Sequence, residues 1–195
     1  MDTESSKMIA GIGSLMIAIS FLVFVGWAVL VIGLIGVILA LIGIKGLADS
    51  YGEPGIFNNA LWALIFMIIG VIAFVVITVF SVFVGITGIA AGDFSNIWTW
   101  ITGIIIGFVV LFVFFILHAV YIRKSFSLLS NKTGEKLFDT AGLVMLIGAI
   151  LTIVIVGVVI LLIAWILAAV AFFTMRTTAT PPPPPPPTTA PPSPP

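Results

Sequence analysis

The stretch that decides the fold is MIAGIGSLMIAISFLVFVGWAVLVIGLIGVILALIGI, residues Met8–Ile44, which contains no charged side chain. It lies between Lys7 and Lys45 and is 37 residues long, counted from Met8 to Ile44. One helix of that length would extend about 55 Å, because each residue adds about 1.5 Å. The hydrocarbon core of a bilayer is only about 30 Å thick. The stretch is therefore predicted to cross a membrane twice, as a helical hairpin.

The composition of the whole chain agrees with a membrane protein. Hydrophobic residues make up 62% of the chain and charged residues 7%, whereas about a quarter of the residues in a soluble domain are charged. Seven basic and seven acidic residues give a net charge of zero, so no nucleic-acid partner is predicted. The absence of cysteine excludes disulfides and thiolate chemistry. The partner that the composition predicts is the lipid bilayer.

Charged residues divide the chain into charge-free runs, and these runs give two topologies. The runs are Met8–Ile44, Pro54–Gly92, Phe94–Ile122 and Thr140–Met175. One helix per run predicts four spans, with two basic residues on one side of the membrane and five on the other. Splitting the first and last runs, near Gly26 and Gly157, predicts six spans with all seven basic residues on one side. Basic residues are retained in the cytoplasm, so we favour six spans in a multi-pass protein of the cell membrane, with both termini cytoplasmic.

The predicted fold class is an all-α integral membrane bundle. The six spans are predicted at residues 8–24, 27–44, 60–84, 97–122, 140–156 and 158–175, within one transmembrane domain of residues 1–176. Asn58-Asn59, Ser95 or Asn96, and Asp139 or Thr140 are predicted to cap the third, fourth and fifth helices. A second span within Pro54–Gly92 is the alternative that would bring Asp93 to the cytoplasmic side.

The last segment, residues 177–195, differs from the rest of the chain. It contains seven consecutive prolines, Pro181–Pro187, and proline lacks the amide hydrogen that helices and sheets need. We predict a disordered cytoplasmic tail of polyproline II character. A spacer is the favoured interpretation, and docking of a partner protein is the alternative.

The first and the last predicted hairpins resemble each other in sequence. A shift of 131 residues places Ala10-Gly11 on Ala141-Gly142 and Val25-Gly26 on Val156-Gly157, and it gives twelve identities over residues 10–45. Both hairpins would start from the cytoplasm, so a duplication would give a parallel repeat. Chance matches within an aliphatic alphabet are the other interpretation.

Small residues are the candidate packing sites. Gly103 and Gly107 form a GxxxG step, and Gly33 and Gly36 lie on neighbouring faces of the second helix. Such positions allow helix backbones to approach closely in lipid. Packing within one subunit is the favoured interpretation. Association into a homo-oligomer, or with another membrane protein, is the alternative.

His118 is the single ionisable residue placed inside a span, near the cytoplasmic end beside Tyr121. Ionisable residues within membranes are functional candidates. A lone histidine has neither a second metal ligand nor a carboxylate partner, so a neutral interfacial histidine is favoured. No catalytic, metal or cofactor site is predicted, because the acid pairs and metal-binding clusters that such chemistry needs are missing from the spans.

Several stretches resemble a known family. Lys136–Gly157, Ala164-Trp-Ile-Leu, Ile9–Leu15 and Gly43–Asp49 are similar to an archaeal family of multi-span membrane proteins, domain of unknown function family 996. The first outer turn, Phe24-Val25-Gly26, lacks the proline that is common in the family. The resemblance implies an archaeal cell-membrane protein and carries no activity or site residue.

The predicted function is that of a non-enzymatic membrane protein acting through helix packing or partner contacts. A small-solute transporter or channel is the first alternative. A membrane anchor or accessory subunit that docks a partner through its proline-rich tail is the second.

Overall fold

The structure is a computed structural model that describes residues 2–21, 28–93, 96–154 and 156–176. These residues form six α-helices and one 3₁₀ turn, and they contain no strand. The elements are α1 (Thr3–Ser20), α2 (Ala28–Ser50), α3 (Pro54–Ala90), α4 (Asn96–Thr133), α5 (Leu137–Leu151), η2 (Thr152–Val154) and α6 (Val156–Thr174). The predicted all-α, six-helix fold is confirmed. The predicted turn at Val25-Gly26 and the tail from residue 177 lie outside the described residues.

Five of these helices are long and apolar enough to cross a membrane. The candidate spans are Val31–Ser50, Pro54–Ala90, Ile97–Thr133, Leu137–Val154 and Val156–Thr174. The described part of α1 is less apolar because Glu4 and Lys7 lie in its first two turns. The chain is therefore a multi-pass membrane protein.

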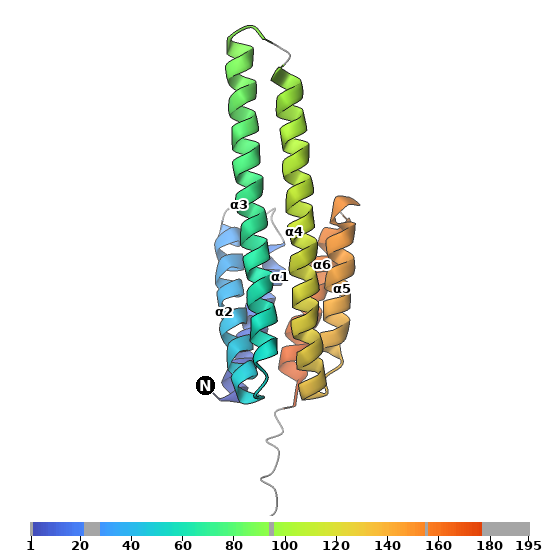
Figure 1. Ribbon diagram of the computed structural model, residues 1–195. Helices are drawn as coiled ribbons and strands as arrows, with labels where there is room; N and C mark the ends of the chain where they lie inside the picture. Colours follow the sequence, from blue (N-terminus) through green and yellow to red (C-terminus); the bar gives the residue numbers. More distant parts are fainter. Residues whose placement is uncertain (1, 22–27, 94–95, 155, 177–195) are drawn as a thin grey trace, which may run out of the picture.

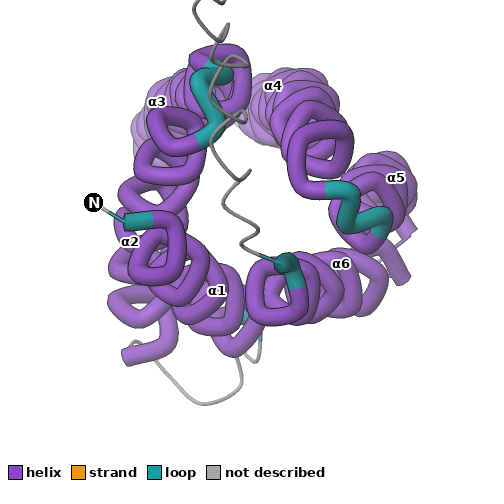
Figure 2. Tube along the Cα trace, turned by 90° about the horizontal axis from the view of Figure 1, so that it is seen from below, coloured by secondary structure: helices purple, strands orange, loops and turns teal. Residues whose placement is uncertain are grey.

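The helices form a ring in chain order (Figure 2). Each helix packs against the next, and α1 packs against α6 to close the ring. The ends at Thr3, Ser50, Pro54, Thr133, Leu137 and Thr174 gather at one end of the molecule, here called the charged end (Figure 1). The opposite end is called the hairpin end, because α3 and α4 extend well beyond the other helices there.

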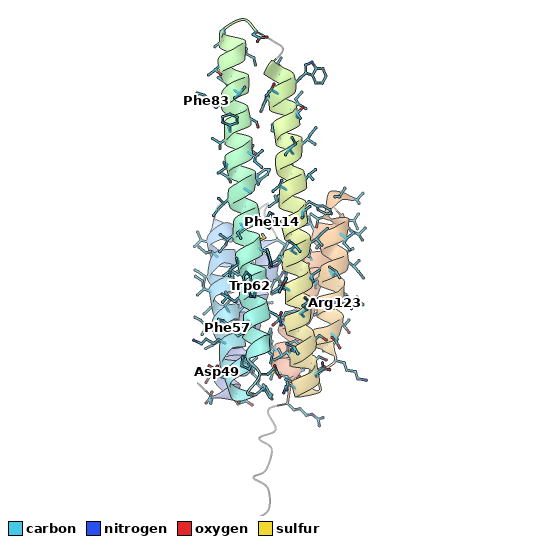
Figure 3. The ribbon with its side chains drawn as sticks, viewed as in Figure 1. Asp49, Phe57, Trp62, Phe83, Phe114 and Arg123 are labelled. Carbon is cyan, nitrogen blue, oxygen red and sulfur yellow. The ribbon has the colours of Figure 1, made fainter. Side chains whose placement is uncertain are left out.

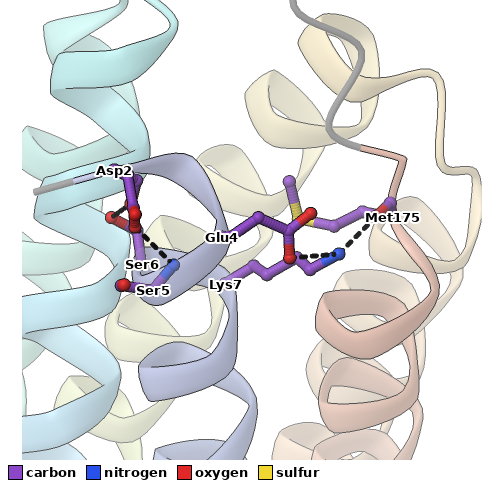
Figure 4. Close-up of polar contacts among 6 residues, drawn as sticks. All are labelled: Asp2, Glu4, Ser5, Ser6, Lys7 and Met175. Atoms are coloured by element: carbon purple, nitrogen blue, oxygen red, sulfur yellow. Dashed lines mark hydrogen bonds and ion pairs between the residues drawn. The ribbon is translucent and has the colours of Figure 1, made fainter.

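Polar contacts at the charged end fix the start of α1 (Figure 4). The Asp2 carboxylate accepts a hydrogen bond from the Ser5 amide, at 2.8 Å, and the Ser5 side chain and amide hold the pKa of Asp2 below its usual value. Lys7 lies 3.0 Å from Glu4 and donates to the carbonyl oxygen of Met175, at 3.4 Å. These contacts connect the start of α1 to the end of α6, so they close the ring between the two termini of the helical bundle.

Small residues and rings alternate between α3 and α4. A Cβ atom added to Gly70 would lie 2.6 Å from the Phe114 side chain, and one added to Gly85 would lie 2.9 Å from that of Trp100. The rings of Phe74 and Phe108 lie 4.9 Å apart between these two points. The two helices therefore stay in close contact along the part that rises beyond the ring, where Phe83 projects outward (Figure 3).

The start of α3 differs from the prediction. The helix begins at Pro54, in the first turn, where proline costs no hydrogen bond. Asn58 and Asn59 lie inside the helix and do not cap it; the Asn59 side chain donates to the carbonyl oxygen of Gly55, at 2.7 Å. The predicted cap is wrong because Pro54 already defines the start of the helix. Neutral polar residues such as Asn58 and Asn59 are then tolerated inside it.

Other helix ends differ as well. Helix α4 includes Asn96 and continues to Thr133, eleven residues past Ile122, before Gly134 turns the chain with a φ of 75°. Helix α5 starts at Leu137, whose amide donates to the Glu135 carboxylate at 3.2 Å. The N-cap residue is Lys136, so the predicted cap at Asp139 or Thr140 is wrong.

One side-chain hydrogen bond joins α3 and α4 at the charged end. The Ser125 hydroxyl donates to the carbonyl oxygen of Ile56, at 2.7 Å, and both residues are buried. We expect Ser125→Ala to lower the free energy of unfolding by about 1 kcal/mol, as measured by denaturation in micelles. Ser14→Ala is the control, because the Ser14 hydroxyl bonds only within its own helix, to Ala10. Equal losses in both variants would contradict a bond that specifically joins two helices.

Candidate functional site

A cavity of ≈ 300 Å³ lies inside the ring, and every helix contributes to its wall. It is partly open, and its lining is almost entirely apolar. The lining residues are Ile17, Ser20, Phe21, Gly33, Val37, Ala40, Leu41, Ile44, Ala60, Leu64, Met67, Phe115, His118, Ala119, Ile122, Met145, Leu161 and Trp165.

The cavity exists because residue size changes along the ring axis. Near the charged end, the buried rings of Phe126, Phe138 and Phe172 fill the space between α4, α5 and α6, with Phe138 and Phe172 4.8 Å apart. The cavity wall, by contrast, includes small residues such as Ala60 and Ala119. The aromatic cluster therefore plugs one side of the ring and leaves open space beyond it.

His118 lies on the cavity wall. Its ring stacks on that of Phe115, at 5.9 Å and 8°, and its Nδ1 lies 3.0 Å from the carbonyl oxygen of Ala63. A carbonyl only accepts, so Nδ1 carries the hydrogen and donates it. In the neutral ring Nε2 is then an acceptor. The bond to Ala63 turns the imidazole towards α3, and the interfacial depth of His118 stays a prediction.

Trp165 adds a donor to the same wall. Its ring packs edge-on against that of Phe126, at 6.5 Å and 85°, and is 8% exposed. Neither its indole N–H nor His118 Nε2 makes a hydrogen bond among the described residues. Within that part of the chain, Thr78 Oγ1 is the one fully enclosed side-chain atom without such a partner. Both residues line the cavity.

The glycines of α2 face α1. A Cβ atom added to Gly33 would lie 2.8 Å from Ser20 Cβ, and one added to Gly36 would lie 2.8 Å from the carbonyl oxygen of Gly13 and 2.9 Å from the amide nitrogen of Ile17. Gly33 also lines the cavity. These two predicted packing positions therefore lie where the backbones of α1 and α2 come close together.

The GxxxG step of α4 faces α3 of the same chain. A Cβ atom added to Gly103 would overlap the Ser81 side chain, and one added to Gly107 would lie 3.1 Å from Thr78 Oγ1. The face that a second copy would use is therefore occupied by α3. Association through Gly103 and Gly107 stays a prediction.

Sequence reasoning did not single out the cavity or several of the residues that shape it. The available signal is the position of Trp165, an aromatic residue in the middle of the predicted span 158–175, away from the interfacial belts where tryptophan is enriched. Nothing in the pattern marked Ala119. Among the described residues, no three histidine, aspartate or glutamate side chains lie close enough to hold a metal.

The comparisons with known proteins fit this architecture. The family model described as "Protein of unknown function (DUF996)" matches residues 32–166, more than half of the chain. The chain belongs to this family. The DUF996 match runs from α2 to α6, so it includes all the cavity-lining residues except those contributed by α1 and Phe21.

One relative extends the likeness to most of the chain. It is the uncharacterised protein MJ1644 of Methanocaldococcus jannaschii, 25% identical over 158 residues, which are 81% of this chain and 84% of the relative. No solved structure matches the chain. Membership of DUF996 was predicted from sequence and is confirmed, and it brings no assigned activity.

Proposed function

We propose that this protein is a non-enzymatic membrane protein that holds an apolar molecule, such as a segment of a lipid tail, in the central cavity. The cavity volume carries the proposal. At about 24 cal/mol per Å³, an empty apolar cavity of ≈ 300 Å³ would cost about 7 kcal/mol. That cost is comparable to the whole stability of many domains, about 5–15 kcal/mol. An occupant that fills the space removes most of it.

The lining selects the class of occupant. Water needs two to four polar partners to remain in a cavity, and aliphatic and aromatic groups make up nearly all of this wall. A charged solute would lose its hydration without a compensating charge. The lining therefore favours an apolar occupant over a charged or strongly polar solute. The volume is at the lower end of ligand pockets, about 300–1,000 Å³.

Two polar groups in the wall refine that class. The indole N–H of Trp165 donates, and Nε2 of a neutral His118 accepts. A hydroxyl group accepts from one and donates to the other, so a hydrocarbon chain that bears one hydroxyl matches the wall better than a bare hydrocarbon. The proposed ligand class is therefore a lipid tail or a long-chain alcohol.

The proposed orientation places the charged end in the cytoplasm. Lys7, Lys45 and Arg123 lie at or near that end, and Lys132 forms a 3.0 Å ion pair with Glu53 there. The retention of basic residues in the cytoplasm supports this orientation. Both termini would then face the cytoplasm, and a partner of the proline-rich tail would meet it there.

Quenching of Trp165 fluorescence by bromododecanol tests the proposal. The other four tryptophans are replaced by phenylalanine, and the protein is titrated in lipid nanodiscs. We expect saturable quenching, because the bromine atom would be held near the indole. A second single-tryptophan protein that keeps only Trp62, which is 50% exposed, is the control and is expected to show quenching that rises without saturation.

A matched pair of variants ties the quenching to the cavity. Ala119→Phe places a ring in the cavity, whereas Val113→Phe places one on the outer face of the same helix, where Val113 is 50% exposed. We expect Ala119→Phe to abolish saturable quenching and Val113→Phe to retain it. Non-saturable quenching of Trp165 in the parent protein, or saturation that survives Ala119→Phe, would overturn the proposal.

A further inference from the structure

The ends of α4 carry the residues that mark the two surfaces of a membrane. Arg123 lies towards the charged end, and Trp98 and Trp100 lie at the hairpin end, where Trp98 is 72% exposed. Twenty-three residues separate Arg123 from Trp100, a rise of about 35 Å. Tryptophan gathers at membrane interfaces and arginine at the cytoplasmic one. The rise exceeds the hydrocarbon thickness of about 30 Å only slightly, so α4 spans the whole layer.

The partner helix gives the same thickness. Gly85 of α3 lies against Trp100, because a Cβ atom added to Gly85 would be 2.9 Å from that side chain. Trp62, 50% exposed, lies twenty-three residues earlier on α3. The rise between them is again about 35 Å, so α3 and α4 together span one full layer.

The α5–α6 hairpin is much shorter. Gly142 packs against Arg123, since an added Cβ atom would lie 3.1 Å from the Arg123 Cα, so the two residues are at the same height. From Gly142, α5 rises nine residues to Leu151, and η2 adds three more. These contribute about 14 Å and about 6 Å. The turn therefore ends about 15 Å below Trp100, at the level shown beside α3 and α4 in Figure 1.

Three of the described residues at this turn are apolar and face outward. Ile153, Val154 and Val156 are 71%, 61% and 58% exposed. The Thr152 hydroxyl donates to the carbonyl oxygen of Gly148, at 2.8 Å, and the Thr152 amide donates to that of Ala149. Local bonds therefore satisfy part of the backbone at the helix end, which lowers the cost of keeping the turn away from water.

We infer that the α5–α6 turn ends inside the hydrocarbon layer and is covered by the lipid tails of the bilayer half at the hairpin end. If the membrane surface instead lay at this turn, α3 and α4 would stand about 15 Å into water. Val79, Phe80 and Phe83, each at least 62% exposed, lie on that part of α3. Such a bare apolar surface marks contact with lipid or protein. The inference rests on helix lengths and is independent of what fills the cavity.

Spin labels in the cysteine-free chain test the inference. One cysteine at a time is introduced as Ile153→Cys, Val109→Cys or Ala91→Cys, and the labelled proteins are placed in liposomes. Val109 is the matched control, because it lies on the outer face of α4, about 21 Å above Arg123, at the height of the turn. Ala91, exposed at the tip of α3, is the water control.

Collision rates with oxygen and with a water-soluble nickel chelate then distinguish the surroundings of each label. We expect the label at 153 to match the label at 109, with frequent oxygen collisions and few nickel collisions. Nickel collisions as frequent as those at 91 would place the turn in water and overturn the inference. Few collisions with either reagent would mean that protein, such as a second copy, covers the turn, and this too would overturn it.

Discussion

Gly13→Leu is expected to prevent α1 from packing on α2 and to leave little folded protein. A Cβ atom added to Gly13 would lie 2.7 Å from the carbonyl oxygen of Gly36 and 2.9 Å from the Cα of Ala40. Both are backbone atoms of α2, so a rotamer change cannot relieve the overlap. In the same way, a Cβ atom added to Gly43 would lie 2.6 Å from the carbonyl oxygen of Ser6. Holding two helices apart at such a contact is expected to cost about 3 kcal/mol or more.

Thermal stability in mild detergent measures this effect, with the yield of monodisperse protein as a second readout. Ile12→Leu is the matched control, because Ile12 is the preceding residue, is 43% exposed and would receive the same side chain. Gly13→Ala should lie between the two, since a methyl group overlaps fewer atoms than a leucine side chain. If Gly13→Leu were as stable as Ile12→Leu, close contact between the backbones of α1 and α2 would be refuted.

The six-helix arrangement was predictable because charge is scarce in this chain. A charged side chain within hydrocarbon is costly, so Lys7 and Lys45 mark where the first hairpin leaves the lipid. The same reasoning places Arg123 near the charged end. These assignments need no knowledge of packing, because the solvent alone imposes them.

The ends of the helices were less predictable, because neutral residues carry no such penalty. Asn59 bonds to the backbone of its own helix and stays within it. Helix α5 begins at Leu137, and the carboxylate of Glu135, two residues earlier, accepts a hydrogen bond from the Leu137 amide. The turn between α5 and α6 lies at Thr152–Val154, ahead of the predicted Gly157, which is buried as the second residue of α6. At each of these points several neighbouring residues could end or begin the helix. A hydropathy pattern does not show which of them does so.

The cavity was beyond sequence reasoning for a different reason. It depends on which small side chains from several helices line the same space, as Gly33, Ala60 and Ala119 do. Small residues are common in membrane helices, and each favours close packing when considered alone. Only the order of helices around the ring shows that they surround a common space.

Removing the proposed occupant is expected to destabilise the protein strongly. Exhaustive exchange into a short-chain detergent should lower the free energy of unfolding by up to about 7 kcal/mol, the cost of emptying ≈ 300 Å³. The loss will be smaller to the extent that the helices move inward. Adding a long-chain alcohol should restore the stability, because a ligand that binds only the folded state stabilises it.

The cavity variant separates this effect from general sensitivity to detergent. Ala119→Phe fills part of the same space with a covalent side chain, so its stability should change less on delipidation and respond less to added alcohol. Val113→Phe should behave like the parent protein. Thermal unfolding followed by intrinsic fluorescence provides the measurement. Suppose that the parent protein, Ala119→Phe and Val113→Phe all lost the same stability on delipidation. The loss would then come from the outer, lipid-facing surface and not from the cavity, because Ala119→Phe changes the cavity and leaves the outer surface as it is in the parent protein.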